Sequence, residues 1–164
     1  MMSRVQKGMI AGLAATLAVS ALEAANLYFG PWAASFPRLI SVMLQTPDQI
    51  AVGWAAYILV GTFVLGPLFG IICPRLPTDT PESKGILFAV GAFIVIGLTV
   101  APLAGMVGER PVGLFFMRAG FGTLAWMIAT HAVFGVVLGN VHGHLVGREW
   151  RPEHPVRDHI HLAH

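Results

Sequence analysis

Glu23 is the one acidic residue deep within a long apolar stretch of this sequence. If that stretch lies in a membrane, burial of the ionisable side chain is costly unless it is paired, so the residue is a candidate for moving a proton or a solute. Tyr57 falls at about the same depth, Asn26 one turn nearer the surface, and His131 deeper. We therefore predict a polar intramembrane cluster in the outer half of the molecule, formed by Glu23, Asn26, Tyr57, Thr130 and His131. The alternative is a structural cluster whose hydrogen bonds only fix the register of the helices.

His131 also raises the question of haem, because histidines in membrane helices can be axial ligands. A bis-histidine site needs a second histidine at similar depth on a facing helix, and the first three apolar stretches contain none. His142 lies on nearly the same face of the same helix, but about 16 Å further along at 1.5 Å per residue. We predict no cofactor. A haem shared between subunits, or one with Met106 or Met127 as a further ligand, is the alternative.

The C-terminal region is rich in histidine, and such tracts can hold metal ions. The spacing is not that of a structural zinc site, so we predict no dedicated metal site there. The weak candidate ligands are His154, His159, His161 and His164. No nucleophile–base pair, phosphate-binding loop or pair of catalytic carboxylates is recognisable. We therefore expect a protein that is not an enzyme.

The composition indicates a membrane protein. Of 164 residues, 55% are hydrophobic and only 11% are charged, whereas soluble domains carry about 25% charged residues. Four apolar stretches reach the roughly 20 residues that a spanning helix needs. Backbone groups in hydrocarbon must be paired within the segment, so all four are predicted to be helices. They cover about 8–29, 49–72, 85–106 and 119–145.

The first stretch begins with basic residues, as a signal peptide does. Leu22 or Glu23 would fall where a small residue should stand three positions before the cut, so we expect this helix to be retained. The whole region 1–147 is then one four-helix transmembrane domain. Residues 148–164 are predicted to be a polar, disordered cytoplasmic tail.

The connection after the first helix contains a short amphipathic pattern. Ser35 is a possible N-cap and Pro37 fits an early helical position. The apolar residues of this segment lie on one broad side, with Arg38 and Gln45 left for water. We predict a short interfacial helix. An irregular loop packed over the bundle is the alternative.

The distribution of basic residues predicts the orientation. With four spans, one side of the membrane receives Arg4, Lys7, Arg75, Lys84, Arg148, Arg151 and Arg157. The other side receives Arg38, Arg110 and Arg118. We therefore expect both termini to be cytoplasmic. The formal net charge of +2 is too small to suggest nucleic-acid binding.

Glycines recur at four-residue spacing along three of the predicted helices. Small residues at this spacing let two helix backbones approach closely, which is how membrane helices associate. The predicted packing positions are Gly8, Gly12, Gly66, Gly70, Gly135, Gly139, Gly143 and Gly147. The pattern does not determine whether these faces pack within the monomer or against another subunit.

The two halves of the chain resemble each other. The segment VLGPLFG at 64–70 matches VLGNVHG at 137–143, and KGMI at 7–10 matches KGIL at 84–87. We predict two tandem helical hairpins related by a pseudo-two-fold axis along the membrane normal. Chance similarity between apolar segments is the competing explanation.

The segments KGMIAGLAATLAVSALE, FPRLISVMLQTPD, PRLP, KGILFAVGAF and THAVFGVVLGNVHGHL together resemble a family of small four-helix bacterial inner-membrane proteins catalogued as a domain of unknown function. The resemblance covers about 7–147. It implies a multi-pass protein of the bacterial inner membrane and assigns no catalytic residues.

Three functions are compatible with these features. The first is a non-enzymatic accessory or assembly subunit that acts through its glycine-lined helix faces, as a homo-oligomer or with other membrane subunits. The second is a small transporter or channel component, with Glu23 and His131 lining the path. The third is a haem- or quinone-associated membrane subunit.

Overall fold

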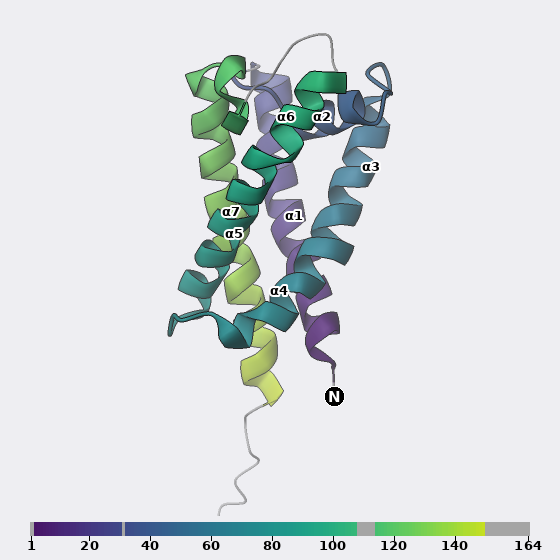
Figure 1. The fold of residues 1–164 in the computed structure, drawn as a ribbon. Coiled ribbons are helices and arrows are strands. Elements are labelled where there is room, and N and C mark those ends of the chain that lie inside the picture. Colours follow the sequence, from purple (N-terminus) through teal and green to yellow (C-terminus); the bar gives the residue numbers. More distant parts are fainter. Residues whose placement is uncertain (1, 31, 108–113, 150–164) are drawn as a thin grey trace, which may run out of the picture.

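The computed structural model describes residues 2–30, 32–107 and 114–149, and this part of the chain forms helices and short connections. Among the described residues, four helical segments are long and apolar enough to cross a membrane: Arg4–Phe29, Ile50–Arg75, Pro81–Leu103 and Phe121–Gly147. They run side by side, with the short helices α2 and α6 at one end and the N-terminus at the other (Figure 1). The predicted all-α membrane fold is confirmed. We refer to the two ends as the α2 end and the N-terminal end.

The first span is a single helix, α1 (Arg4–Phe29). Its start is fixed by a capping box, in which the Ser3 hydroxyl accepts from the Gln6 N–H and the Gln6 side chain accepts from the Ser3 N–H. It ends at Gly30, whose φ of 135° is a conformation that other residues rarely adopt.

The second span is interrupted near its middle. It consists of α3 (Ile50–Val60), a π-helical turn (Gly61–Leu65), α4 (Gly66–Ile72) and a short 3-10 turn to Arg75. Pro67 has no N–H to donate to the carbonyl group four residues earlier, and the π-helical turn ends at Leu65, two residues before it. The turn widens the helix at membrane depth, next to α1.

The third span is broken, whereas the sequence predicted one helix over 85–106. Here α5 (Pro81–Leu98) stops at Thr99, and α6 (Val100–Val107) begins directly after it. Pro102 accounts for the break, because its ring conflicts with the Leu98 carbonyl and it cannot donate the helical hydrogen bond. A 3-10 segment (Leu114–Ala119) that the sequence did not predict leads into the fourth span.

The fourth span is α7 (Phe121–Glu149). Of the predicted polar tail, residues 150–164 lie outside the described part of the chain, and with them the four candidate metal ligands of that tail.

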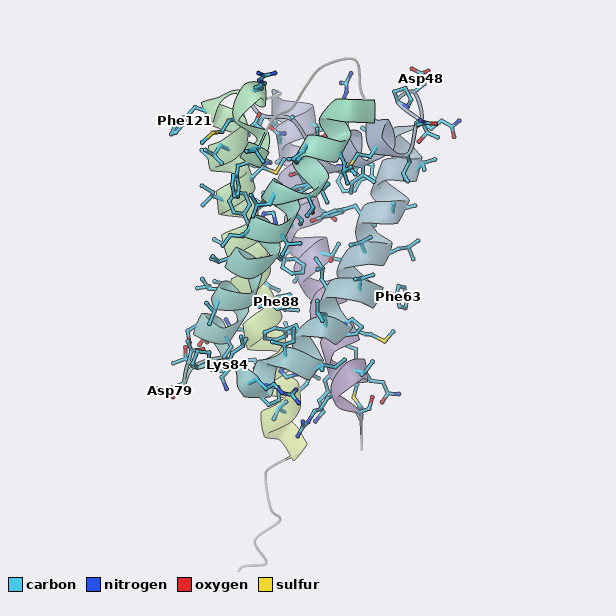
Figure 2. All side chains as sticks on the ribbon, in the orientation of Figure 1. Asp48, Phe63, Asp79, Lys84, Phe88 and Phe121 are labelled. Carbon is cyan, nitrogen blue, oxygen red and sulfur yellow. The ribbon has the colours of Figure 1, made fainter. Side chains whose placement is uncertain are left out.

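The spans are arranged as an open row. α1 packs against α4 and α7, and α7 packs against α5, so α3 and α5 form the two edges of the row. At the N-terminal end, the rings of Phe69 on α4 and Phe88 on α5 meet at 5.3 Å and close the gap between the edges. Phe88 points into the bundle there (Figure 2). At the other end, α2 (Phe36–Met43) packs on α3 and also contacts α6.

Most of the predicted packing glycines lie in contacts within the monomer. A Cβ atom on Gly8 or Gly12 would overlap backbone of the second span, and one on Gly66 or Gly70 would overlap backbone of α1. Gly135 and Gly139 face the start of α5 in the same way, and Gly143 faces the Pro81 ring. A Cβ atom on Gly147 would have no atom of another described residue within 4 Å, so this glycine is not a packing position within the described part of the chain.

The outer surface is apolar along the spans and charged at the ends. Large hydrophobic side chains are exposed on every span, among them Leu17, Phe63, Val95 and Ile128. Asp48 lies at the α2 end, while Asp79 and Lys84 lie at the N-terminal end (Figure 2). A surface of this kind is suited to a lipid environment.

Candidate functional site

The Glu23 side chain connects α1 to α2 and to α7 through hydrogen bonds. Its side chain is completely buried. One carboxyl oxygen accepts a 2.9 Å hydrogen bond from the Trp126 indole on α7, and the other accepts from the Phe36 backbone N–H at 3.3 Å. Phe36 is the first residue of α2, where a carboxyl group is favoured by the unpaired N–H groups and by the helix dipole. Glu23 thus caps α2 from a neighbouring helix.

Asn26 holds the connection between α1 and α2. Its side-chain oxygen accepts from the backbone N–H groups of Trp32 and Ala33, and its amide nitrogen donates to the Ala33 carbonyl. The side chain is 1% exposed. Thr123 on α7 extends the arrangement, because its hydroxyl accepts from the Ala34 N–H. We call Glu23, Asn26, Thr123 and Trp126 the latch, since together they fix α2 and its connection to α1 and α7.

Asn26→Ala is expected to loosen this connection. The substitution leaves the N–H groups of Trp32 and Ala33 without their acceptor, at a cost of about 1–3 kcal/mol for each buried group. Hydrogen–deuterium exchange of the peptide 32–36 should therefore accelerate by roughly tenfold or more. Asn26→Asp is the matched control, because it keeps the acceptor oxygen and should show a smaller increase. Unchanged exchange in Asn26→Ala would contradict this role.

Ser35 is the N-cap residue of α2, as the sequence predicted, but its side chain makes no capping bond. The Ser35 hydroxyl is buried and has no hydrogen-bond partner within the described structure. The Glu23 carboxyl group occupies the position at the helix start instead. On its other side α2 is packed tightly on α3, because a Cβ on Gly53 would overlap the Pro37 carbonyl.

The remaining residues of the predicted cluster are arranged around Phe36. The Phe36 ring stacks on Tyr57 with centroids 6.1 Å apart and lies 5.4 Å from the His131 ring. Thr130 and His131 bond within α7: the Thr130 hydroxyl donates to the Trp126 and Met127 carbonyls, and His131 Nδ1 lies 2.7 Å from the Met127 carbonyl oxygen. The structure therefore separates the predicted cluster into two parts. Glu23 and Asn26 belong to the latch, and Tyr57, Thr130 and His131 lie beside it.

These three residues line a cavity of about 330 Å³ beneath α2. Its roof is formed by Phe36, Ile40 and Met43 of α2. α3 and the π-helical turn supply one wall, and α5 and α6 supply the opposite wall. Thr16 and Val19 of α1, together with α7 residues, form the back. Nearly all of the lining is hydrocarbon or aromatic.

The cavity reaches the outer surface of the helix bundle. Two of its lining residues, Leu44 and Val60, are 50% and 45% exposed. Val60 lies ten residues into the second span, which is about 15 Å from the start of that helix. The hydrocarbon core of a bilayer is about 30 Å thick, so this part of the opening lies near its middle. A molecule dissolved in the bilayer could enter between α3 and α5.

Several residues of this region were not predicted from the sequence. Trp126 stands four residues before Thr130, on the same helix face, and its indole N–H was a recognisable partner for Glu23. Gly85 packs against Gly135, and the match between KGMI and KGIL places it at the position of Gly8. The small residues Ala56 and Ala92, which leave room for the cavity, carry no comparable signal.

No group of three or more metal-ligating side chains occurs within the described residues.

Comparison with known proteins identifies a family for this chain but assigns no activity to it. No curated protein and no solved structure matches the chain. A family model matches residues 2–153, and the protein therefore belongs to the Family of unknown function (DUF6789).

Proposed function

We propose that this protein is a non-enzymatic multi-pass membrane protein that binds a lipid-soluble molecule in the cavity between α3 and α5. The observation that carries the proposal is the cavity itself: about 330 Å³, lined almost entirely by apolar groups and open toward the bilayer. Small-molecule sites usually have volumes of about 300–1,000 Å³ and apolar walls with few polar groups. Tyr57, Thr130 and His131 are such polar groups here.

The size of the cavity supports an occupant. The apolar walls of the cavity lack van der Waals partners wherever no molecule fills it. Apolar cavities tend to stay dry, so water is a poor filler. A hydrocarbon chain or ring from the bilayer supplies the missing van der Waals contacts.

The latch supports the same function, because it keeps the roof of the cavity in place. Glu23 bonds the first residue of α2, and Phe36, Ile40 and Met43 of that helix cover the cavity. The buried carboxyl group thus contributes to the site by positioning α2 rather than by contact with a ligand.

An accessory role in a larger assembly would need a surface other than the glycine faces. All but one of the eight predicted packing glycines already contact other helices of the same chain. A homo-oligomer or a complex with other membrane subunits would therefore form through the exposed aliphatic faces. A transporter would need a continuous polar path, and the contact of Phe69 with Phe88 lies across the gap below the cavity.

We further propose that the protein lies in the bacterial inner membrane with both termini cytoplasmic. Arg4, Lys7, Arg75 and Lys84 support this orientation, because they all lie toward the N-terminal end of the bundle. The packing of Gly8 on Gly66 and of Gly85 on Gly139 supports an origin by duplication, because the two pairs occupy matching positions in the two halves.

Ala56→Trp is expected to prevent binding by filling the cavity with an indole ring. Native mass spectrometry of the protein released from its own membranes should show a bound lipid-sized mass on the wild type, and less than about a tenth of that occupancy on the variant. Ala55→Trp is the matched control, because Ala55 is the neighbouring residue, is exposed and does not line the cavity. Equal occupancy in both variants, or no bound mass on the wild type, would contradict the proposed function.

A further inference from the structure

We infer that the molecule bound in the cavity carries a hydroxyl group, which donates a hydrogen bond to Nε2 of His131. This inference rests on the proposed function and specifies its ligand as a lipid-soluble alcohol or phenol. The apolar remainder of the molecule would fill the cavity and extend between α3 and α5 into the bilayer.

The tautomer of His131 determines what the site can accept. Nδ1 lies 2.7 Å from the carbonyl oxygen of Met127, and a carbonyl oxygen can only accept a hydrogen bond. Nδ1 must therefore carry a proton. In the neutral ring Nε2 then has a free lone pair and acts only as an acceptor. A ligand that complements it must donate.

Nε2 has no hydrogen-bond partner within the described residues, although the ring lines the cavity. The neighbours of the ring are aromatic: Phe36 lies at 5.4 Å and Phe93 at 5.2 Å, between ring centroids. An acceptor that faces an apolar cavity gains more from a hydrogen bond than an acceptor in water does. Ethers, ketones and esters offer no donor, so they leave Nε2 unpaired.

Tyr57 provides a second polar group, on the α3 wall of the cavity. Its side chain lines the cavity, and its hydroxyl makes no hydrogen bond with any other described residue. A phenol can donate as well as accept. The Tyr57 and His131 rings both lie next to the Phe36 ring, so the Tyr57 hydroxyl is a second polar group available to a ligand in the same cavity.

The test uses probe pairs in which a methyl group replaces the hydroxyl proton, so that one member of each pair lacks the donor. Purified full-length protein is mixed with equal amounts of farnesol and farnesyl methyl ether, and separately with 4-nonylphenol and 4-nonylanisole. Native mass spectrometry then measures the ratio of the two bound species in each mixture. We expect the hydroxyl compound to be favoured by about tenfold, the effect of one hydrogen bond of ordinary strength. The pair with the higher total occupancy shows whether a chain alcohol or a phenol is the better ligand.

Two variants link the preference to His131. His131→Phe keeps a ring of similar shape without an acceptor, and should bind the alcohol and the ether equally. His131→Gln supplies a carbonyl oxygen and should restore part of the preference. Equal binding of alcohol and ether by the wild type, or an unchanged preference in His131→Phe, would overturn this inference and leave the cavity intact as a binding site. No binding of any probe by the wild type would overturn the proposed function itself. The wild-type ratio requires no variant, so a poorly folded substitution cannot obscure the result.

Discussion

Glu23→Ala is expected to lower the free energy of unfolding by about 3 kcal/mol. The substitution leaves the Trp126 indole N–H and the Phe36 backbone N–H without their acceptor, and each unpaired buried donor costs about 1–3 kcal/mol. Removing the buried carboxyl group recovers part of that loss, because its burial is itself unfavourable. Equilibrium unfolding in mixed micelles, followed by far-ultraviolet circular dichroism, measures the change.

A double-mutant cycle isolates the bond between Glu23 and Trp126. Trp126→Phe removes the donor and keeps an aromatic ring in its place. The double variant should be more stable than the sum of the two single effects predicts, because both remove the same hydrogen bond. Glu23→Gln is the conservative control and should lose about half as much stability, since its amide offers one acceptor oxygen for two donors. Strictly additive effects would show that the two side chains do not act as a pair.

Gly85→Ala is expected to destabilise the protein at least as much as Glu23→Ala does. We expect it to lower the free energy of unfolding by about 3 kcal/mol or to prevent folding. A Cβ on Gly85 would overlap the Gly135 carbonyl oxygen and lie 2.8 Å from the Gly139 backbone nitrogen. Because both obstacles are backbone atoms, α5 and α7 must separate along their contact to make room. The same unfolding measurement in mixed micelles tests this effect.

Gly91→Ala is the matched control on the same helix. In the described part of the chain, no atom outside the adjacent turns of α5 lies within 4 Å of a Cβ at that position, and alanine has the higher helix propensity. This variant should be as stable as the wild type or up to about 1 kcal/mol more stable. Equal free energies of unfolding for Gly85→Ala and Gly91→Ala would mean that the close approach of α5 and α7 is not important for stability.

The sequence was sufficient to predict the spans, because long apolar stretches and the need to pair every backbone group leave few alternatives in a membrane. It also predicted the short helix after the first span, with Ser35 as its N-cap residue. It did not predict the break at Thr99, although Pro102 was visible and could have been read as the cause. Applying the helix-breaking effect of proline to each proline in the predicted spans would have predicted this break.

The site was less predictable, because it depends on which helices meet. Glu23 and His131 are both polar residues within spans. Both carboxyl oxygens of Glu23 accept hydrogen bonds, from Trp126 and Phe36, whereas Nε2 of His131 has no partner among the described residues. The cavity arises from α3 and α5 standing at the two edges of the row, and nothing in the local sequence of either helix specifies that arrangement.

Photolabelling in the membrane tests the central claim most directly. A diazirine-bearing hydrocarbon dissolved in the bilayer, activated by light and followed by peptide mapping, reports where lipid-soluble molecules reside on the protein. We predict adducts concentrated on cavity residues such as Ile40, Ala56 and Ile96, and their loss in Ala56→Trp but not in Ala55→Trp. Labelling spread evenly over exposed residues such as Leu17 and Val95, with no enrichment at the cavity, would contradict the account.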